Sequence, residues 1–229
     1  MEVEFCCSDA SAFSLGFAAS HSGTLILENS ENVLSDYVNT LRPCIISKPH
    51  TDAGRAFAEY LMNAGCVSEE GMLDSPSLAP AAAEYALKMD LNVLLGAKIV
   101  SVENDLVRIY TNSGLQEIVC GKIIRVPEVK TDFKMLNCIV SGTDCDTLLQ
   151  FEKYGGRIRS SFEKDELIVS LPFDHACRLN EARIEFVNII KACFGASVQI
   201  DAFAADFEYS NGFADIIEEF EAGAEYDIL

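Results

Sequence analysis

The chain opens on the stretch Val3-Glu4-Phe5-Cys6-Cys7-Ser8-Asp9-Ala10-Ser11-Ala12-Phe13, and a second apolar run, Leu25-Ile26-Leu27-Glu28, follows it. The apolar residues from 3 to 7 predict a short strand, and the small residues from 10 to 20 predict a helix that Gly23 ends. Residues 24–28 predict a second strand, which closes on an acid. This order of elements predicts a βαβ unit at the start of an α/β protein.

The turn between the first strand and the helix decides what such a unit can bind. In a dinucleotide-binding unit this turn reads G-x-G-x-x-G, and the second glycine lets the backbone approach a pyrophosphate. Here the three positions hold Cys7, Asp9 and Ala12, and Glu28 stands where a ribose-binding acid would be. Ala12 can fill the third role, but Asp9 puts a carboxylate at the positive end of the helix, where a diphosphate would lie. We interpret Cys7, Asp9, Ala12 and Glu28 as vestigial fingerprint positions, none of them a confident cofactor contact.

The hydrophobic period changes along the rest of the chain from 3.6 to 2 residues. Helices are expected first, at 31–41, 52–64 and 77–88. Strands that form a β-meander and a return strand follow, at 93–95, 98–103, 106–111, 115–119 and 123–126. The remainder predicts an α+β region with strands at 136–140, 167–171 and 197–202 and a helix at 180–194.

In this order of elements, the first 126 residues resemble the start of the FAD-dependent oxidoreductases of the two-dinucleotide-binding-domain type. The resemblance is carried by the residues 3–7, 10–20, 25–28, 91–100, 106–119 and 120–126. It implies a Rossmann-like FAD/NAD(P)-binding-type βαβ core with an inserted antiparallel β-meander and a smaller α+β C-terminal region. The implied domains are a degenerate FAD-binding-type domain at 1–131, a substrate-domain-like region at 132–212 and an acidic, apolar tail at 213–229.

Departures from the family pattern shape the functional expectation. The return strand leads into Val126-Pro127-Glu128 instead of the family's Ala-Thr-Gly turn, and the family's segment that closes over the flavin is not recognisable. We therefore expect a truncated, non-catalytic relative (a pseudoenzyme) that acts as an accessory or interaction subunit, with no catalytic residue and no cofactor. The alternative is an active FAD-dependent oxidoreductase, with its site completed by a partner subunit.

Charge narrows the range of partners. The chain has 17 basic and 36 acidic residues and a net charge of −19, which argues against nucleic acid and against an anionic membrane. No Lys or Arg follows Lys191, while acids interleave there with apolar residues such as Ile216, Phe220 and Tyr226. This segment is either a solvated terminus or a docking tail for a protein partner, namely a catalytic homologue or a redox subunit.

Other motifs give weaker signals. The nine cysteines include no C-x-x-C pair and lie mostly in apolar runs, which favours free buried thiols over disulfides. With no basic leader and no run of about 18 apolar residues, a cytoplasmic location is expected. The three histidines show no metal-ligand spacing. Asp174-His175-Ala176-Cys177 is either an activated thiol or a loop, and Gly155-Gly156-Arg157-Ile158-Arg159 is either an anion site or a hairpin turn.

Overall fold

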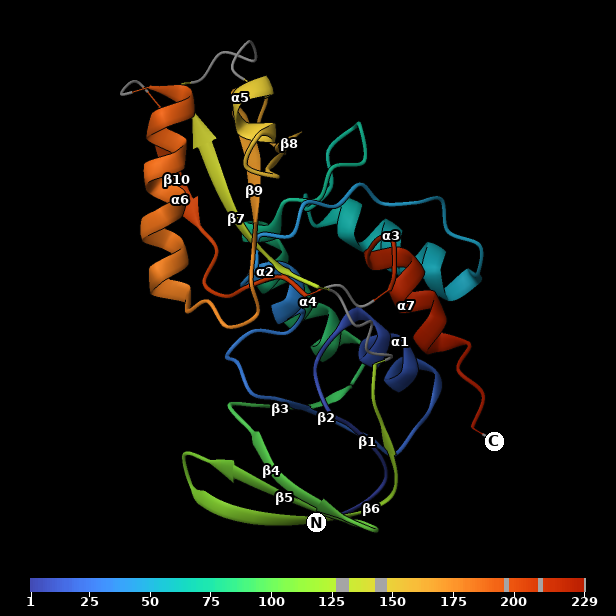
Figure 1. Cartoon of the computed structure of the whole chain (residues 1–229). Helices are drawn as coiled ribbons and strands as arrows, with labels where there is room; N and C mark the ends of the chain where they lie inside the picture. Colours follow the sequence, from blue (N-terminus) through green and yellow to red (C-terminus); the bar gives the residue numbers. More distant parts are fainter. Residues whose placement is uncertain (127–131, 143–147, 196–197, 210–211, 229) are drawn as a thin grey trace.

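The computed structural model describes residues 1–126, 132–142, 148–195, 198–209 and 212–228, and it holds two sheets (Figure 1). The first sheet has six strands in the order β3-β2-β1-β6-β5-β4, and the second has four in the order β10-β7-β9-β8. The expected α/β class is confirmed. The strand 197–202 and the turn at Pro127 lie partly or wholly outside the described residues.

The predicted βαβ unit forms the centre of the first sheet. It consists of β1 (Glu2–Cys7), α1 (Ala12–Ser20) and β2 (Thr24–Glu28). Strand β1 runs parallel to β2, with Phe5 opposite Thr24 and Cys7 opposite Ile26. Strand β3 (Asn92–Leu95) continues the parallel order beyond β2. The carboxyl ends of three parallel strands therefore meet at one edge of this sheet.

The β-meander is continuous with the parallel sheet. It is formed by β4 (Lys98–Glu103), β5 (Leu106–Thr111) and β6 (Gly114–Ile124). Two strands were expected where β6 is one, because β6 has a partner along its whole length. It pairs antiparallel with β5, where Leu106 lies opposite Val119, and parallel with β1, where Cys7 lies opposite Ile124.

The helices that follow β2 differ in part from the expectation. The helix expected at 31–41 is reduced to α2 (Ser35–Val38), because Leu34 adopts a left-handed conformation (φ 56°) and donates its N–H to the Ala10 carbonyl. Helix α3 (Asp52–Asn63) is as expected. Helix α4 (Ser75–Lys88) starts before Ser77, because the carboxylate of Asp74 accepts the Ser77 N–H at 3.2 Å and caps the helix.

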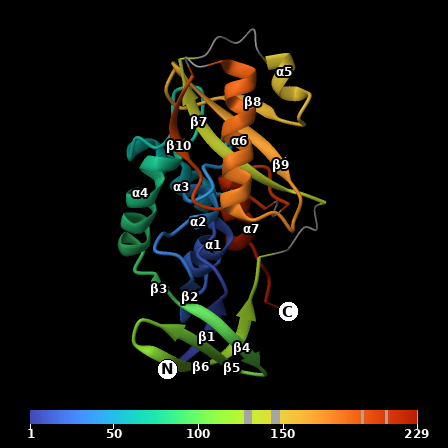
Figure 2. The same cartoon turned by 60° about the vertical axis from the view of Figure 1, so that its left-hand side comes forward.

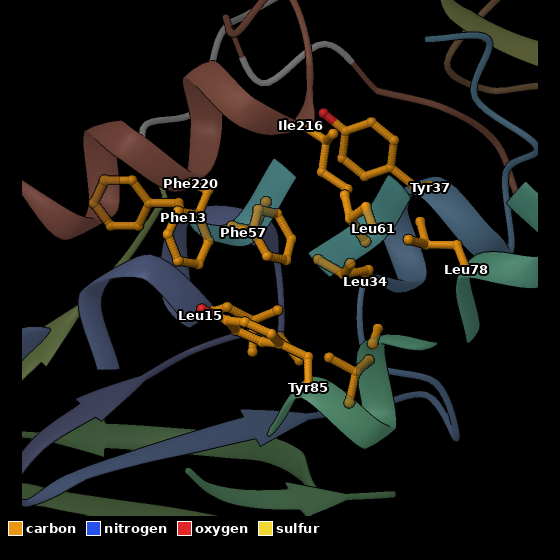
Figure 3. Close-up of a cluster of buried hydrophobic side chains, with 14 of the residues drawn as sticks. Phe13, Leu15, Leu34, Tyr37, Phe57, Leu61, Leu78, Tyr85, Ile216 and Phe220 are labelled. Atoms are coloured by element: carbon orange, nitrogen blue, oxygen red, sulfur yellow. The ribbon is translucent and has the colours of Figure 1, made fainter. Parts of the chain in front are cut away.

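Alternation along β1 divides the apolar core around the first sheet into two clusters. Phe5 and Cys7 pack among the helices, whereas Cys6 packs with the meander residues Val107 and Ile109 on the opposite face. Figure 3 shows the helix-side cluster, in which side chains from α1, α3, α4 and α7 converge. The helix-side cluster is the larger of the two.

The segment expected to be an acidic tail forms helix α7 (Ile216–Ala224), which lies beside α1 (Figure 1). Its apolar side chains Ile216, Ile217 and Phe220 are in the chain's own core, and the rings of Phe220 and Phe57 stack with centroids 4.2 Å apart. The segment forms a helix on the core instead of a free tail because its apolar residues lie on one face of an amphipathic helix, and that face is buried. Three of the apolar residues that suggested a docking tail are therefore buried in this chain's own core, whereas Tyr226 is exposed.

The second sheet carries one long helix on its face (Figure 2). Its elements are β7 (Lys134–Ser141), α5 (Leu148–Glu152), β8 (Arg157–Ser160), β9 (Glu166–Phe173), α6 (Leu179–Phe194) and β10 (Gln199–Phe203). Phe186 of α6 packs against Phe151 and Phe173. The stretch 155–159 is not a hairpin turn: it leads into β8, whose Arg157 pairs with Ser170 of β9.

Within the described residues, no helix is both long and apolar enough to cross a membrane. The eight cysteines of these residues are free thiols, and all of them are buried except Cys177, which is partly exposed.

Candidate nucleotide site at the carboxyl ends of β1 and β2

The four fingerprint positions lie together at one edge of the parallel sheet. Cys7 is the last residue of β1, Glu28 is the last residue of β2, Ala12 is the first residue of α1, and Asp9 lies in the turn between them. In open α/β sheets, ligands bind outside the carboxyl ends of the strands. This edge is therefore the candidate functional site.

Asp9 places its carboxylate against the first turn of α1. Its Oδ1 atom accepts hydrogen bonds from the Ser11 N–H and the Ser14 hydroxyl, both at 3.1 Å, and its Oδ2 atom accepts one from the Ser8 hydroxyl at 3.3 Å. Ser11 is the N-cap of the helix and accepts the Ser14 N–H at 3.3 Å. Because a helix N-terminus favours a negative charge, the chain supplies its own anion at this position.

Glu28 fixes the backbone of the same turn. Its side chain is buried; Oε2 accepts the Ala10 N–H at 3.0 Å and the Ser35 hydroxyl at 3.2 Å, and Oε1 accepts the Ser30 N–H at 2.7 Å. Hydrogen bonds to an ionised carboxylate are the stronger ones. The sequence placed Glu28 as a ribose-binding acid but carried no signal for its contact with Ala10, which depends on how the turn folds.

Cys7 and Ala12 have no exposed surface. Burial raises the pKa of the Cys7 thiol to about 12, so this thiol is neutral at physiological pH and is not a nucleophile. Both side chains are small, which allows α1 to pack closely on the sheet.

A cluster of buried charged groups lies beside this site, and the sequence analysis missed it. The Tyr37 hydroxyl donates a hydrogen bond to Glu219 Oε2 at 3.1 Å, and the Arg42 guanidinium lies 4.8 Å from the Tyr37 ring centroid. Among the described residues, both carboxylate oxygens of Asp36 are buried without a hydrogen-bond partner. Burial first, and then the negative charges of Glu219 and Asp9, raise the pKa of Asp36 well above its usual range.

The cluster also connects the two sheets. Arg42 Nη2 donates to the Phe213 carbonyl at 2.9 Å, and Arg42 Nε lies 3.6 Å from Glu208 Oε1. From strand β7, Asn137 Nδ2 donates to Glu208 Oε2 at 2.7 Å and to the Thr40 carbonyl at 2.9 Å. The residues that flank the candidate site therefore hold the second sheet in place.

The loop at 174–177 has a structural role. Lys134 Nζ donates hydrogen bonds to the carbonyls of His175 and Cys177, at 3.1 and 2.7 Å, and the Asp174 carboxylate accepts the Ala176 N–H at 2.7 Å. These contacts favour the loop interpretation over an activated thiol. Within the described ranges, no three His, Cys, Asp or Glu side chains are grouped so that they could hold a metal ion.

No protein-family model matches the chain, and no curated protein matches it. Solved structures do. The p-nitrophenol 4-monooxygenase PnpA from Pseudomonas putida DLL-E4 matches with a TM-score of 0.50 at 9% identity, over 88% of this chain and 66% of that chain. The halogenase PltM matches with a TM-score of 0.53 at 12% identity, over 96% and 67%. BexE matches with a TM-score of 0.54 at 8% identity, over 97% and 60%.

At these identities the likeness shows the fold. The chain has the FAD-dependent oxidoreductase fold that its sequence resembles, and it spans 66% of PnpA and 60% of BexE. The expectation that no cofactor binds is contradicted, because the solved proteins that share this fold are FAD-binding flavoenzymes. The presence of Asp9 does not by itself exclude a cofactor. Its side chain can rotate away from the N-terminus of α1 while the sheet stays folded.

The residues present fit FAD in part. Glu28 fits by its position at the end of β2, but its carboxylate is buried and already accepts three hydrogen bonds from the protein. Ala12 fits the close contact between helix and strand. The N-terminus of α1 fits a diphosphate only with the Asp9 carboxylate moved away, because that carboxylate holds the Ser11 N–H and the Ser14 hydroxyl.

Proposed function

We propose that this chain is an FAD-dependent oxidoreductase unit, in which FAD lies across the carboxyl ends of β1 and β2. The observation that carries the proposal is the position of Glu28, at the end of β2 and bonded to the β1–α1 turn, in a fold shared with a monooxygenase and a halogenase. When bound, FAD would supply electron or hydride transfer to and from a substrate.

The chain's own residues would then bind and orient the cofactor. Glu28 would accept hydrogen bonds from the ribose hydroxyls, as the acid at this position does in dinucleotide-binding units. The N-terminus of α1 would face the diphosphate. Neither role needs a catalytic side chain, and we assign none.

A partner subunit that completes the site belongs to the same proposal. The chain's net charge of −19 favours a basic surface on that partner.

Flavin retention tests the proposal. The purified chain is incubated with FAD, passed through a desalting column and examined by flavin absorbance and native mass spectrometry. We expect retained FAD in the unmodified chain, and loss of at least tenfold in affinity in Glu28→Gln. The exposed Glu70→Gln is the control and should retain FAD. Equal retention by Glu28→Gln and the control would contradict the assigned role of Glu28.

A second candidate is a non-catalytic accessory subunit of the same fold, and the contacts of Asp9 with Ser11 and Ser14 favour it. An anion supplied by the protein itself weakens the hold on a diphosphate. The two candidates differ in turnover: FAD-loaded protein that accepts hydride from NADH or NADPH supports the oxidoreductase, and FAD-loaded protein that never becomes reduced supports the accessory subunit.

A further inference from the structure

We propose that the Asp9 carboxylate is a built-in competitor for the diphosphate of the nucleotide, and that the exchange takes place by rotation of the Asp9 side chain while the turn stays closed. This inference rests on the proposed FAD site. It identifies Asp9 as the residue that sets the affinity of that site.

The Asp9 carboxylate occupies the hydrogen-bond donors at the N-terminus of α1. Its two oxygens accept three hydrogen bonds, one of them from the N–H of the N-cap residue Ser11 and one from the hydroxyl of Ser14 in the first turn of α1. A diphosphate at the same helix end needs the same donors and the same positive end of the helix dipole. Only one of the two anions can hold them.

The groups that surround Asp9 are also acidic. Both carboxylate oxygens of Asp36 are buried and have no hydrogen-bond partner within the described residues, and the negative charges of Glu219 and Asp9 oppose its ionisation. The electrostatic potential at this edge of the sheet is therefore already negative. The positive charge of Arg42 acts in the opposite direction and lowers the pKa of Asp36. A bound diphosphate beside an unmoved Asp9 would add further negative charge, so departure of Asp9 is favoured on binding.

The turn itself is held in place. The N–H of Ser8 donates to the Ile124 carbonyl at 3.1 Å, the N–H of Ala10 donates to Glu28 at 3.0 Å, and the Ala10 carbonyl accepts the Leu34 N–H at 2.8 Å. The backbone on both sides of Asp9 is thus fixed, which leaves the Asp9 side chain as the part that can move. No opening of the loop is needed.

The experiment compares Asp9→Asn with the unmodified chain by isothermal titration with FAD, ADP and adenosine. Asparagine keeps an oxygen that can accept at the helix N-terminus but removes the charge. We expect at least tenfold tighter binding of FAD and ADP and unchanged binding of adenosine, which lacks the diphosphate. Asp105→Asn, an exposed position with the same change of charge, is the matched control and should leave all three affinities unchanged.

The outcomes separate the inference from the proposed function. If the unmodified chain binds FAD and Asp9→Asn binds FAD and ADP with the same affinity, the inference is overturned and the proposed function stands. Asp9→Ser is the second variant in case Asp9→Asn fails to fold. If the unmodified chain and both variants all fail to bind FAD and ADP, the inference and the proposed function are both overturned. A matching gain for adenosine would also overturn the inference, because that gain would not depend on a diphosphate.

Discussion

The hydroxyl of Tyr37 donates a hydrogen bond of 3.1 Å to Glu219 Oε2, and the two residues are 182 positions apart in the chain. Tyr37 lies in α2 near the β1–α1 turn, and Glu219 lies in α7. Neither side chain has any exposed surface. Helix α7 is therefore packed into the helix-side cluster of the first sheet, beside the candidate site.

Removal of the Tyr37 hydroxyl should destabilise the chain. Tyr37→Phe deprives the buried Glu219 carboxylate of a donor, and such a loss costs about 1–3 kcal/mol. Urea denaturation of Tyr37→Phe measures the change in the free energy of unfolding. Tyr110→Phe, at an exposed position of β5, is the control and should unfold at the same urea concentration as the unmodified chain. An equal stability of both variants would show that the bond contributes nothing.

Asp36 gives the stability an unusual dependence on pH. Because burial and Glu219 raise its folded-state pKa above the ordinary 3.8, the folded chain keeps a proton that the unfolded chain has released. Its contribution is full below pH 3.8 and is lost as the pH rises through the folded-state pKa. Asparagine does not ionise, so Asp36→Asn avoids the loss of stability that ionisation of the carboxyl causes. At pH 8 it should stabilise the chain by about 1–3 kcal/mol, the cost of an unpaired buried polar group.

Thermal melts from pH 4 to pH 9 check this prediction. The gain in Asp36→Asn should grow with pH, whereas Asp105→Asn should follow the unmodified chain. A gain that is constant across this range would mean that the Asp36 carboxylate does not titrate there.

Close contact between α1 and α7 predicts that two glycines cannot be replaced. A Cβ on Gly16 would lie 2.0 Å from the Phe220 carbonyl oxygen, and one on Gly223 would lie 1.9 Å from the Phe13 carbonyl oxygen. Since both obstacles are backbone atoms, Gly16→Ala should force the helices apart and cost about 3 kcal/mol or more. At Gly65 an added Cβ meets nothing within 4 Å, so Gly65→Ala should cost only the strain of its positive φ, about 1–2 kcal/mol. Chemical denaturation that ranks the two variants in the opposite order would contradict the helix contact.

The lowered pKa of Glu221 predicts that the chain loses stability in acid. Burial raises the pKa of its carboxyl, but hydrogen bonds from Thr51 N–H and His50 N–H, both at 2.7 Å, outweigh burial and leave the pKa below 4.5. Its contribution is therefore present above pH 4.5 and is lost as the pH falls through the folded-state pKa. Glu221→Gln should cost about 1–3 kcal/mol at pH 7 and less in acid, as measured by melts at both pH values. Glu59→Gln on the exposed face of α3 is the control, and an equal cost for both would refute the assignment.

Much of the fold could be predicted, because the elements carry their own patterns. Alternating apolar residues define β4 and β5, and the apolar face from Phe57 to Leu61 defines α3. The extent of α2 could not be predicted, since the left-handed Leu34 follows from its bond to Ala10, which is remote in sequence. Helix α7 was interpreted as a tail because its acids dominated. Its visible signals were the helical spacing of the apolar residues Ile216, Ile217 and Phe220 and the presence of Gly223, since a glycine inside a helix often marks close packing.

The candidate site could be predicted in its residues but not in its contacts. Cys7, Asp9, Ala12 and Glu28 were found from their spacing, because the βαβ layout fixes where the turn and the second strand end. The clamp of Glu28 on Ala10 and the burial of Asp36 next to Glu219 depend on tertiary packing, which brings separate segments together. The cofactor expectation was wrong because a single substituted loop was given more weight than the fold.

The most direct test is native mass spectrometry of the chain after incubation with excess FAD. We expect one FAD for each chain, with higher occupancy in Asp9→Asn than in the unmodified protein at the same FAD concentration. An absence of bound FAD in both proteins at saturating concentration would contradict this expectation.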